Sequence, residues 1–171
     1  MAIFTIAFDP PHAAAITTYI EKVAAYVREP VSTSALVRVG GSTIPSEAGI
    51  YAIYERGTLI YVGESGSLKA RFGDLFKTMN HSFRRTLGKK LYGSEPGFTP
   101  ATTKRLFPGD IEKRLTEHMA TALTFLAVPI AFGRIEIEER LVAMCPGLLN
   151  SRGQRGIRIF SQSLHQGVKT A

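Results

Sequence analysis

Apolar side chains recur at helical spacing in several parts of this chain. After Pro10 and Pro11 they fall on one face of residues 12–28, which predicts an amphipathic helix that ends before Pro30. A second apolar stripe follows the sequence YVG and consists of Leu68, Phe72, Leu75 and Phe76. Further helices are predicted at residues 82–92, at 110–122 and at about 134–145.

Short runs of β-branched and aromatic residues predict three strands. The runs GIYAIYE at 49–55 and TLIYVG at 58–63 are joined by the turn sequence RGT, which predicts a hairpin. The run TFLAVPI at 124–130 is expected at a sheet edge, because Pro129 has no N–H to donate. Residues 1–8 could add a short strand. The expected fold is therefore α/β, with a small three-stranded, mostly antiparallel sheet flanked by helices.

The length of the hairpin loop decides on which faces Tyr51 and Tyr61 lie. A two-residue loop would pair Tyr51 with Val62 and send the two tyrosines to opposite faces. A three-residue loop, from Glu55 to Gly57, would place Gly57 in the left-handed conformation. It would also pair Tyr51 directly with Tyr61. Glycine stands where this longer loop requires it, so we expect the second arrangement.

Composition and charge narrow the function classes. Hydrophobic residues make up 44% of the chain and charged residues 20%, as in a globular protein. The formal net charge of +7 favours a polyanionic partner. The single cysteine excludes an internal disulfide framework and agrees with a cytoplasmic location. The sequence has neither a membrane-length apolar run nor a secretory signal, and too few cysteines and histidines for a structural zinc site.

A carboxylate and an arginine fall on helix faces that are otherwise apolar. The predicted face that contains Glu138 also contains Ile135, Val142 and Cys145. A carboxylate on the core side needs a charged partner or a metal ion, unless it lies at the edge of the stripe and reaches water. Arg71 is likewise predicted on an inward face, where it could hold a phosphate or pair with Glu138. Tyr51 and Tyr61 could simply pack across the two strands.

These residues occur with a recognisable spacing. Nine residues separate GIY from YVG, and Arg71 stands ten positions after Tyr61. Near the far end, EERLVAMCPGLLN contains Glu138, an apolar pair, a proline and Asn150. Over residues 47–150 the chain resembles the GIY-YIG nuclease superfamily. The match leaves an N-terminal extension with an amphipathic helix at 1–46 and a basic C-terminal tail at 151–171.

The resemblance implies a metal-dependent endonuclease that hydrolyses phosphodiester bonds in DNA. A single Mg²⁺ or Mn²⁺ ion would bind Glu138, and Arg71 would hold a phosphate oxygen. Tyr51 would act as general base or relay the proton, and Tyr61 would orient Tyr51 or the water. The residues implied in catalysis are Tyr51, Tyr61, Arg71, Glu138 and His81.

Two positions depart from the family pattern. Many members carry His or Tyr four residues after the arginine, where this chain has Leu75. His81, ten residues after Arg71, could substitute. Some members have Lys directly after YIG, where this chain has Glu64. The departures affect the proton-transfer partners and not the arginine or the metal ligand.

Basic side chains dominate residues 69–92, which favours contact with phosphates along a duplex; the alternative is a solvated basic face. The residues expected to contact nucleic acid are Lys69, Lys77, Arg84, Arg85, Lys89, Lys90 and Asn150. A catalytically silent nucleic-acid-binding module is the alternative function, and RNA is also a possible substrate. Specificity would come from the basic tail or from a protein partner.

Overall fold

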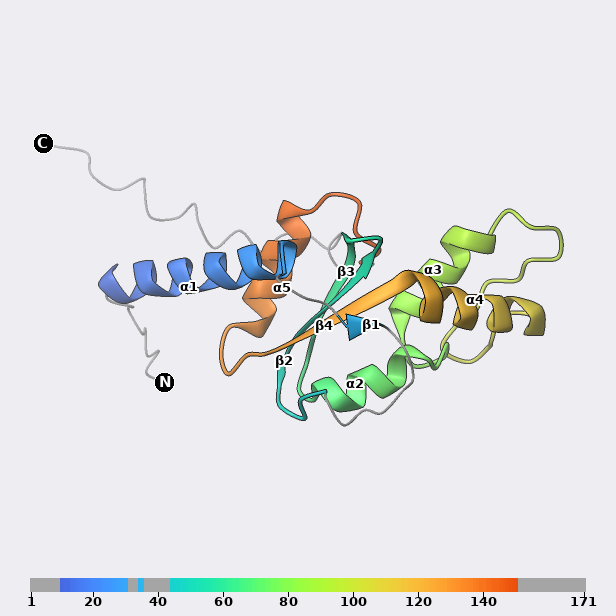
Figure 1. The fold of residues 1–171 in the computed structure, drawn as a ribbon, viewed down its shortest axis with the longest axis horizontal. Helices are drawn as coiled ribbons and strands as arrows, with labels where there is room; N and C mark the ends of the chain where they lie inside the picture. Colours follow the sequence, from blue (N-terminus) through green and yellow to red (C-terminus); the bar gives the residue numbers. More distant parts are fainter. Residues whose placement is uncertain (1–9, 31–33, 36–43, 151–171) are drawn as a thin grey trace, which may run out of the picture.

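The chain is described here by a computed structural model that covers residues 10–30, 34–35 and 44–150. In these ranges five helices surround one four-stranded sheet (Figure 1). The helices are α1 (Pro10–Arg28), α2 (Leu68–Leu75), α3 (Ser82–Tyr92), α4 (Gly109–Ala122) and α5 (Arg134–Met144). The strands are β1 (Ser34–Ala35), β2 (Gly49–Glu55), β3 (Thr58–Ser65) and β4 (Leu123–Pro129). The α/β class and the predicted helices are confirmed; the strand expected at 1–8 and the basic tail lie outside the described residues.

The strands pair antiparallel in the order β1-β4-β2-β3. The three predicted strands form the main sheet, but β4 is not an edge strand, because the two-residue strand β1 pairs with it at Thr124 and Phe125. Pro129 lies at the other end of β4, so its missing N–H does not interrupt this pairing. A two-residue strand shows no alternating pattern, which is why the sequence did not predict β1.

The hairpin differs from the predicted one, yet both tyrosines lie on one face. Its loop has two residues with positive φ, Arg56 at 51° and Gly57 at 79°, and Glu55 pairs with Thr58. The register then shifts by one residue, so that Ile53 pairs with Tyr61 and Tyr51 pairs with Gly63. This bulge, which the sequence pattern did not reveal, reverses the side-chain phase of β3 and brings Tyr61 to the face of Tyr51.

Two layers of helices cover the two faces of the sheet. The face that carries Tyr51 and Tyr61 packs against α2, α3 and α4. The face that carries Ile50 and Val62 packs against α1 and α5, which lie side by side in Figure 1. The hydroxyl of Tyr54 donates a hydrogen bond to the carbonyl of Val27 in α1. Helix α1, expected as part of an extension, therefore contributes directly to the core.

Helix α5 exposes a different face from the one predicted. Ile135 is 57% exposed, whereas Ile137 and Leu141 are fully buried against the sheet. The helix has two rows of apolar side chains, one that contains Ile135 and one that contains Ile137 and Leu141. The sequence pattern predicted that the first row is buried, which is wrong. Glu138 follows Ile137 directly, so it lies half-buried at the border of the buried row rather than on an apolar stripe.

Candidate active site

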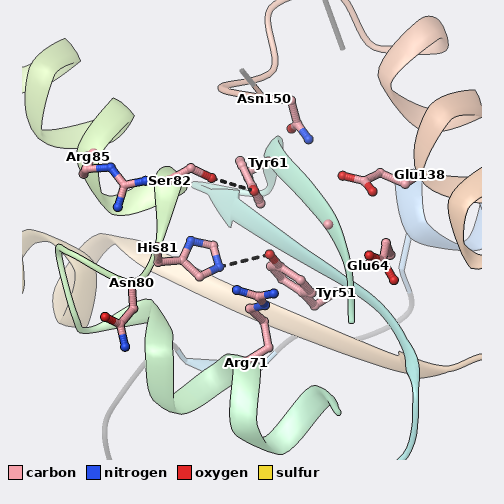
Figure 2. Close-up of a pocket in the computed structure, with 11 residues that line it drawn as sticks. Tyr51, Tyr61, Glu64, Arg71, Asn80, His81, Ser82, Arg85, Glu138 and Asn150 are labelled. Atoms are coloured by element: carbon pink, nitrogen blue, oxygen red, sulfur yellow. Dashed lines mark hydrogen bonds between the residues drawn. The ribbon is translucent and has the colours of Figure 1, made fainter. Parts of the chain in front are cut away.

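A cavity of about 350 Å³ lies beside the edge strand β3 (Figure 2). It is lined by Tyr51, Tyr61, Gly63, Glu64, Arg71, Asn80, His81, Ser82, Arg85, Glu138 and Asn150. The five residues expected in catalysis are all among them. Because β3 is the last strand, α2 and α3 from one face and α5 from the other can all place side chains at its edge.

Two glycines of the motif, Gly63 and Gly49, allow other groups to pack directly against the strand backbone. A Cβ atom added to Gly63 would lie 2.4 Å from the hydroxyl oxygen of Tyr51, so the phenol lies directly against the β3 backbone. A Cβ atom on Gly49 would lie 2.2 Å from the carbonyl oxygen of Val128 and 2.7 Å from a methyl group of Leu68. The first glycine lets Tyr51 reach the cavity, and the second lets α2 approach the sheet.

Tyr51 and His81 form a hydrogen-bonded pair in which the roles can be assigned. His81 is the N-cap of α3, and its Nδ1 accepts a hydrogen bond from the N–H of Phe83. Burial and the nearby charge of Arg71 lower the pKa of His81 to about 4, so the imidazole is neutral at pH 7. A neutral ring with an accepting Nδ1 carries its proton on Nε2, which lies 3.0 Å from the Tyr51 hydroxyl. His81 therefore donates to the oxygen of Tyr51.

Tyr51 is held as a neutral phenol in the absence of added positive charge. Burial raises its pKa above the ordinary range, and the neighbouring Tyr61 and Glu138 act in the same direction. The guanidinium of Arg71 opposes them. The ring of Tyr61 lies 6.0 Å from that of Tyr51, and its hydroxyl lies 3.4 Å from Oγ of Ser82. Added positive charge near the phenol would favour its ionised form.

Arg71 projects into the cavity from α2, as predicted. Ser67 caps this helix by accepting a hydrogen bond from the N–H of Ala70, and Phe72 and Leu75 anchor it in the core. The side chain of Arg71 is half-buried, and its Nε has no hydrogen-bond partner among the described residues. An unsatisfied buried donor is costly, so an anion that enters the cavity would remove this cost.

The arginines of residues 10–30, 34–35 and 44–150 differ in how their charge is compensated. Four of them pair with carboxylates: Arg84 with Glu112, Arg114 with Glu95 and Asp110, Arg134 with Glu64, and Arg140 with Glu21. Three others, Arg28, Arg56 and Arg105, are exposed to water. Only Arg71 and Arg85 are half-buried without a described carboxylate within 4.0 Å, and both line the cavity.

Two carboxylates face these arginines across the cavity. Figure 2 shows Glu64 and Glu138 on one side, with Arg71, His81 and Arg85 on the other. Oε2 of Glu64 lies 3.2 Å from Nη1 of Arg134, the residue one turn before Glu138 on α5. The sequence marked Glu64 only as a departure from the family pattern, because its approach to α5 depends on its place at the sheet edge.

The donor set fits a weakly held divalent cation. Carboxylate oxygens are the ligands that Mg²⁺ and Mn²⁺ prefer, and Glu138, with Glu64 beside it, offers them. No group of three or more His, Cys, Asp or Glu side chains is arranged around a common point in the described part of the chain. Phosphate oxygens and water would have to complete the coordination.

Two residues expected to contact nucleic acid form hydrogen bonds within the protein. Arg84 is 1% exposed and donates to Thr78 and to the Glu112 carboxylate, because α4 covers it. Asn150 lines the cavity, but its side-chain amide bonds both the N–H and the carbonyl of Val62 in β3. Of the remaining expected contacts, Arg85 is half-buried and lines the cavity, and four lysines are exposed on or near α2 and α3: Lys69, Lys77, Lys89 and Lys90.

Comparison with protein-family models, curated proteins and solved structures finds no match to this chain. Within the described residues, no helix is long and apolar enough to cross a membrane. The likeness to GIY-YIG nucleases therefore rests on the motif residues alone. Asn80 and Ser82, which sequence reasoning missed in the cavity, flank the predicted residue His81.

Proposed function

We propose that this protein is a metal-dependent endonuclease that hydrolyses phosphodiester bonds in DNA. The observation that carries the proposal is the cavity itself. It combines two arginines that lack a carboxylate partner among the described residues, a phenol–imidazole pair and an opposing carboxylate, Glu138. A phosphodiester needs positive charge on its oxygens and a base for the attacking water, and this arrangement offers both.

Each side chain has a distinct role in this proposal. Arg71 binds a non-bridging oxygen of the scissile phosphate and satisfies its own buried Nε. Tyr51, as phenolate, takes a proton from the attacking water, and the N–H of His81 stabilises the phenolate oxygen. His81 is thus a positioning residue rather than the base. Tyr61 fixes the Tyr51 ring through their contact.

Glu138 couples the metal to the base. Its negative charge contributes to the raised pKa of Tyr51, so a cation bound to it would reverse this contribution. Glu138 would hold the divalent ion, which would supply positive charge to the phosphate and to the leaving 3′-oxygen. Tyr51 would therefore become an effective base only when both metal and substrate are present.

Plasmid nicking with Mg²⁺ or Mn²⁺ tests the proposal. Tyr51→Phe and Glu138→Gln should each lower the cleavage rate by at least about 100-fold, the lower end of the effect of a general base. Glu136→Gln on the exposed side of α5 and Tyr92→Phe, away from the cavity, serve as matched controls and should cleave normally. Equal cleavage by Glu138→Gln and the unchanged protein would exclude the proposed role.

A catalytically silent nucleic-acid-binding module is the second candidate. It is supported by Leu75, which stands where many nucleases carry His or Tyr and is fully buried in the core. This function predicts that the protein shifts duplex DNA in a gel without nicking it at any Mg²⁺ or Mn²⁺ concentration. Parallel digestion of RNA and duplex DNA distinguishes the two substrates.

A further inference from the structure

The guanidinium of Arg85 is fixed in place before any ligand binds. Its Nη1 donates to the carbonyl oxygens of Thr78 and Met79, at 2.8 and 2.9 Å. A guanidinium has five N–H groups in a rigid fork, and the described residues leave Nε and Nη2 for a ligand in the cavity. Since the structure describes no carboxylate within ion-pair distance of it, this rigid donor is suited to an anion.

Arg71 and Arg85 occupy separate positions in the cavity. They come from α2 and α3, and Figure 2 shows His81 between their guanidinium groups. The positive charges of both arginines help to lower the pKa of His81, so both guanidinium groups lie near its ring. Two guanidinium groups that are separated by an imidazole are better suited to two neighbouring phosphates than to one.

We propose that Arg85 binds the phosphate adjacent to the one held by Arg71 on the same strand. The ligand class is therefore a polynucleotide with consecutive phosphates, and a single phosphate group would occupy only part of the site. This inference rests on the proposed nuclease function for the identity of the strand, but it concerns binding and not cleavage.

Thymidine 3′,5′-bisphosphate tests the inference, because it carries two phosphates on one nucleoside and contains no diester bond to cleave. Calorimetric titration in Mg²⁺ compares it with thymidine 5′-monophosphate and 3′-monophosphate. We expect the bisphosphate to bind about tenfold more tightly than either monophosphate, a typical gain from one charge-assisted contact. Arg85→Gln should reduce this ratio to about 1, while monophosphate binding stays within about twofold.

Arg105→Gln is a matched control. Arg105 also lacks a described carboxylate partner and also bonds a backbone carbonyl, that of Pro100, but it does not line the cavity. Its variant should keep the full bisphosphate preference. If Arg85→Gln does not fold, as judged by circular dichroism, Arg85→Lys replaces it and should lower the ratio at least about threefold, since an ammonium cannot reproduce the fork.

The outcomes separate this inference from the proposed function. Equal binding of bisphosphate and monophosphates, or a full preference retained in the Arg85 variant, would overturn the second phosphate position. Metal-dependent nicking that requires Glu138 would still support the nuclease. A clear bisphosphate preference that depends on Arg85 would support the second position even if no nicking occurs.

Discussion

At the scale of single residues, the cavity depends on the close contact between the Tyr51 hydroxyl and the backbone of Gly63. The two residues are directly paired across β2 and β3, and the phenol lies over its partner. Any side chain at position 63 would therefore occupy the place of the hydroxyl group. The glycine of the YVG motif is required by this contact and not by backbone conformation, since its φ is not positive.

Gly63→Ala should displace Tyr51, because the added methyl group would lie 2.4 Å from the phenol oxygen. Overpacking of this kind costs about 1–3 kcal/mol of unfolding free energy, and DNA nicking should also be lost. Gly66→Ala is the control, since a Cβ atom there meets nothing within 4 Å. Chemical denaturation and plasmid nicking measure both effects. Similar behaviour of the two variants would contradict the close contact.

His81 should make stability depend on pH. Its pKa is lowered to about 4 in the folded protein from 6.5. Below pH 6.5 the unfolded chain takes up a proton that the folded protein does not. The contribution of His81 to the free energy of unfolding is therefore complete above pH 6.5 and is lost as the pH falls toward 4. The total loss is about 3 kcal/mol.

His81→Asn isolates this effect, because asparagine can still cap α3 but does not titrate. Urea unfolding of both proteins between pH 7 and pH 4 should show the unchanged protein losing more stability than the variant. The difference should approach about 3 kcal/mol. Parallel pH curves for the two proteins would show that His81 is not held neutral by the fold.

At the scale of elements, the sequence predicted the five helices and the strands β2, β3 and β4, but neither the short strand β1 nor how β2 and β3 are paired. The expected three-residue loop is wrong, and the two-residue loop alone would have separated the tyrosines. The bulge between Leu59 and Tyr61 compensates for the shorter loop. Such a bulge depends on packing against both faces of the sheet, and a single strand sequence does not encode it.

Helices α3 and α4 are joined by an ion pair between the buried Arg84 and the half-buried Glu112, at 2.8 Å. Glu112→Gln should destabilise the protein by about 3–5 kcal/mol, because it leaves Arg84 charged and buried without its counterion. Glu95→Gln, which breaks a more exposed pair with Arg114, should cost about 1 kcal/mol or less. Thermal and urea unfolding test both variants. Equal losses of unfolding free energy in the two variants would mean that the Arg84 guanidinium is exposed to water.

At the scale of the whole molecule, the cavity forms where elements from both faces of the sheet meet at one edge. Motif spacing predicted four of the lining residues, Tyr51, Tyr61, Arg71 and Glu138, and His81 was predicted as a substitute for the residue that the pattern lacks at Leu75. Spacing could not predict the burial of Arg84, which requires α4 to fold over α3, or the orientation of α5. Both depend on contacts between segments that are distant in sequence.

If a duplex crosses this edge, the exposed lysines of α2 and α3 should contribute to the salt dependence of binding. Lys89→Gln should lower the slope of log K against log[salt] by about 0.9, the value for one phosphate contact on duplex DNA. Lys22→Gln on α1, which belongs to the opposite layer of helices, should leave the slope unchanged. Fluorescence anisotropy at several salt concentrations measures the slope. Identical slopes for the two variants would contradict the binding of a duplex along α2 and α3.

Asn150 has a consequence for self-association. By bonding both polar backbone groups of Val62, with Leu149 donating to Ile60 alongside, it shields an outer strand that could otherwise recruit a strand from another molecule. Asn150→Ala should therefore promote concentration-dependent oligomers, visible by light scattering. A variant that stays monomeric would show that this shielding is unnecessary. The asparagine thus covers part of the β3 edge as well as lining the cavity.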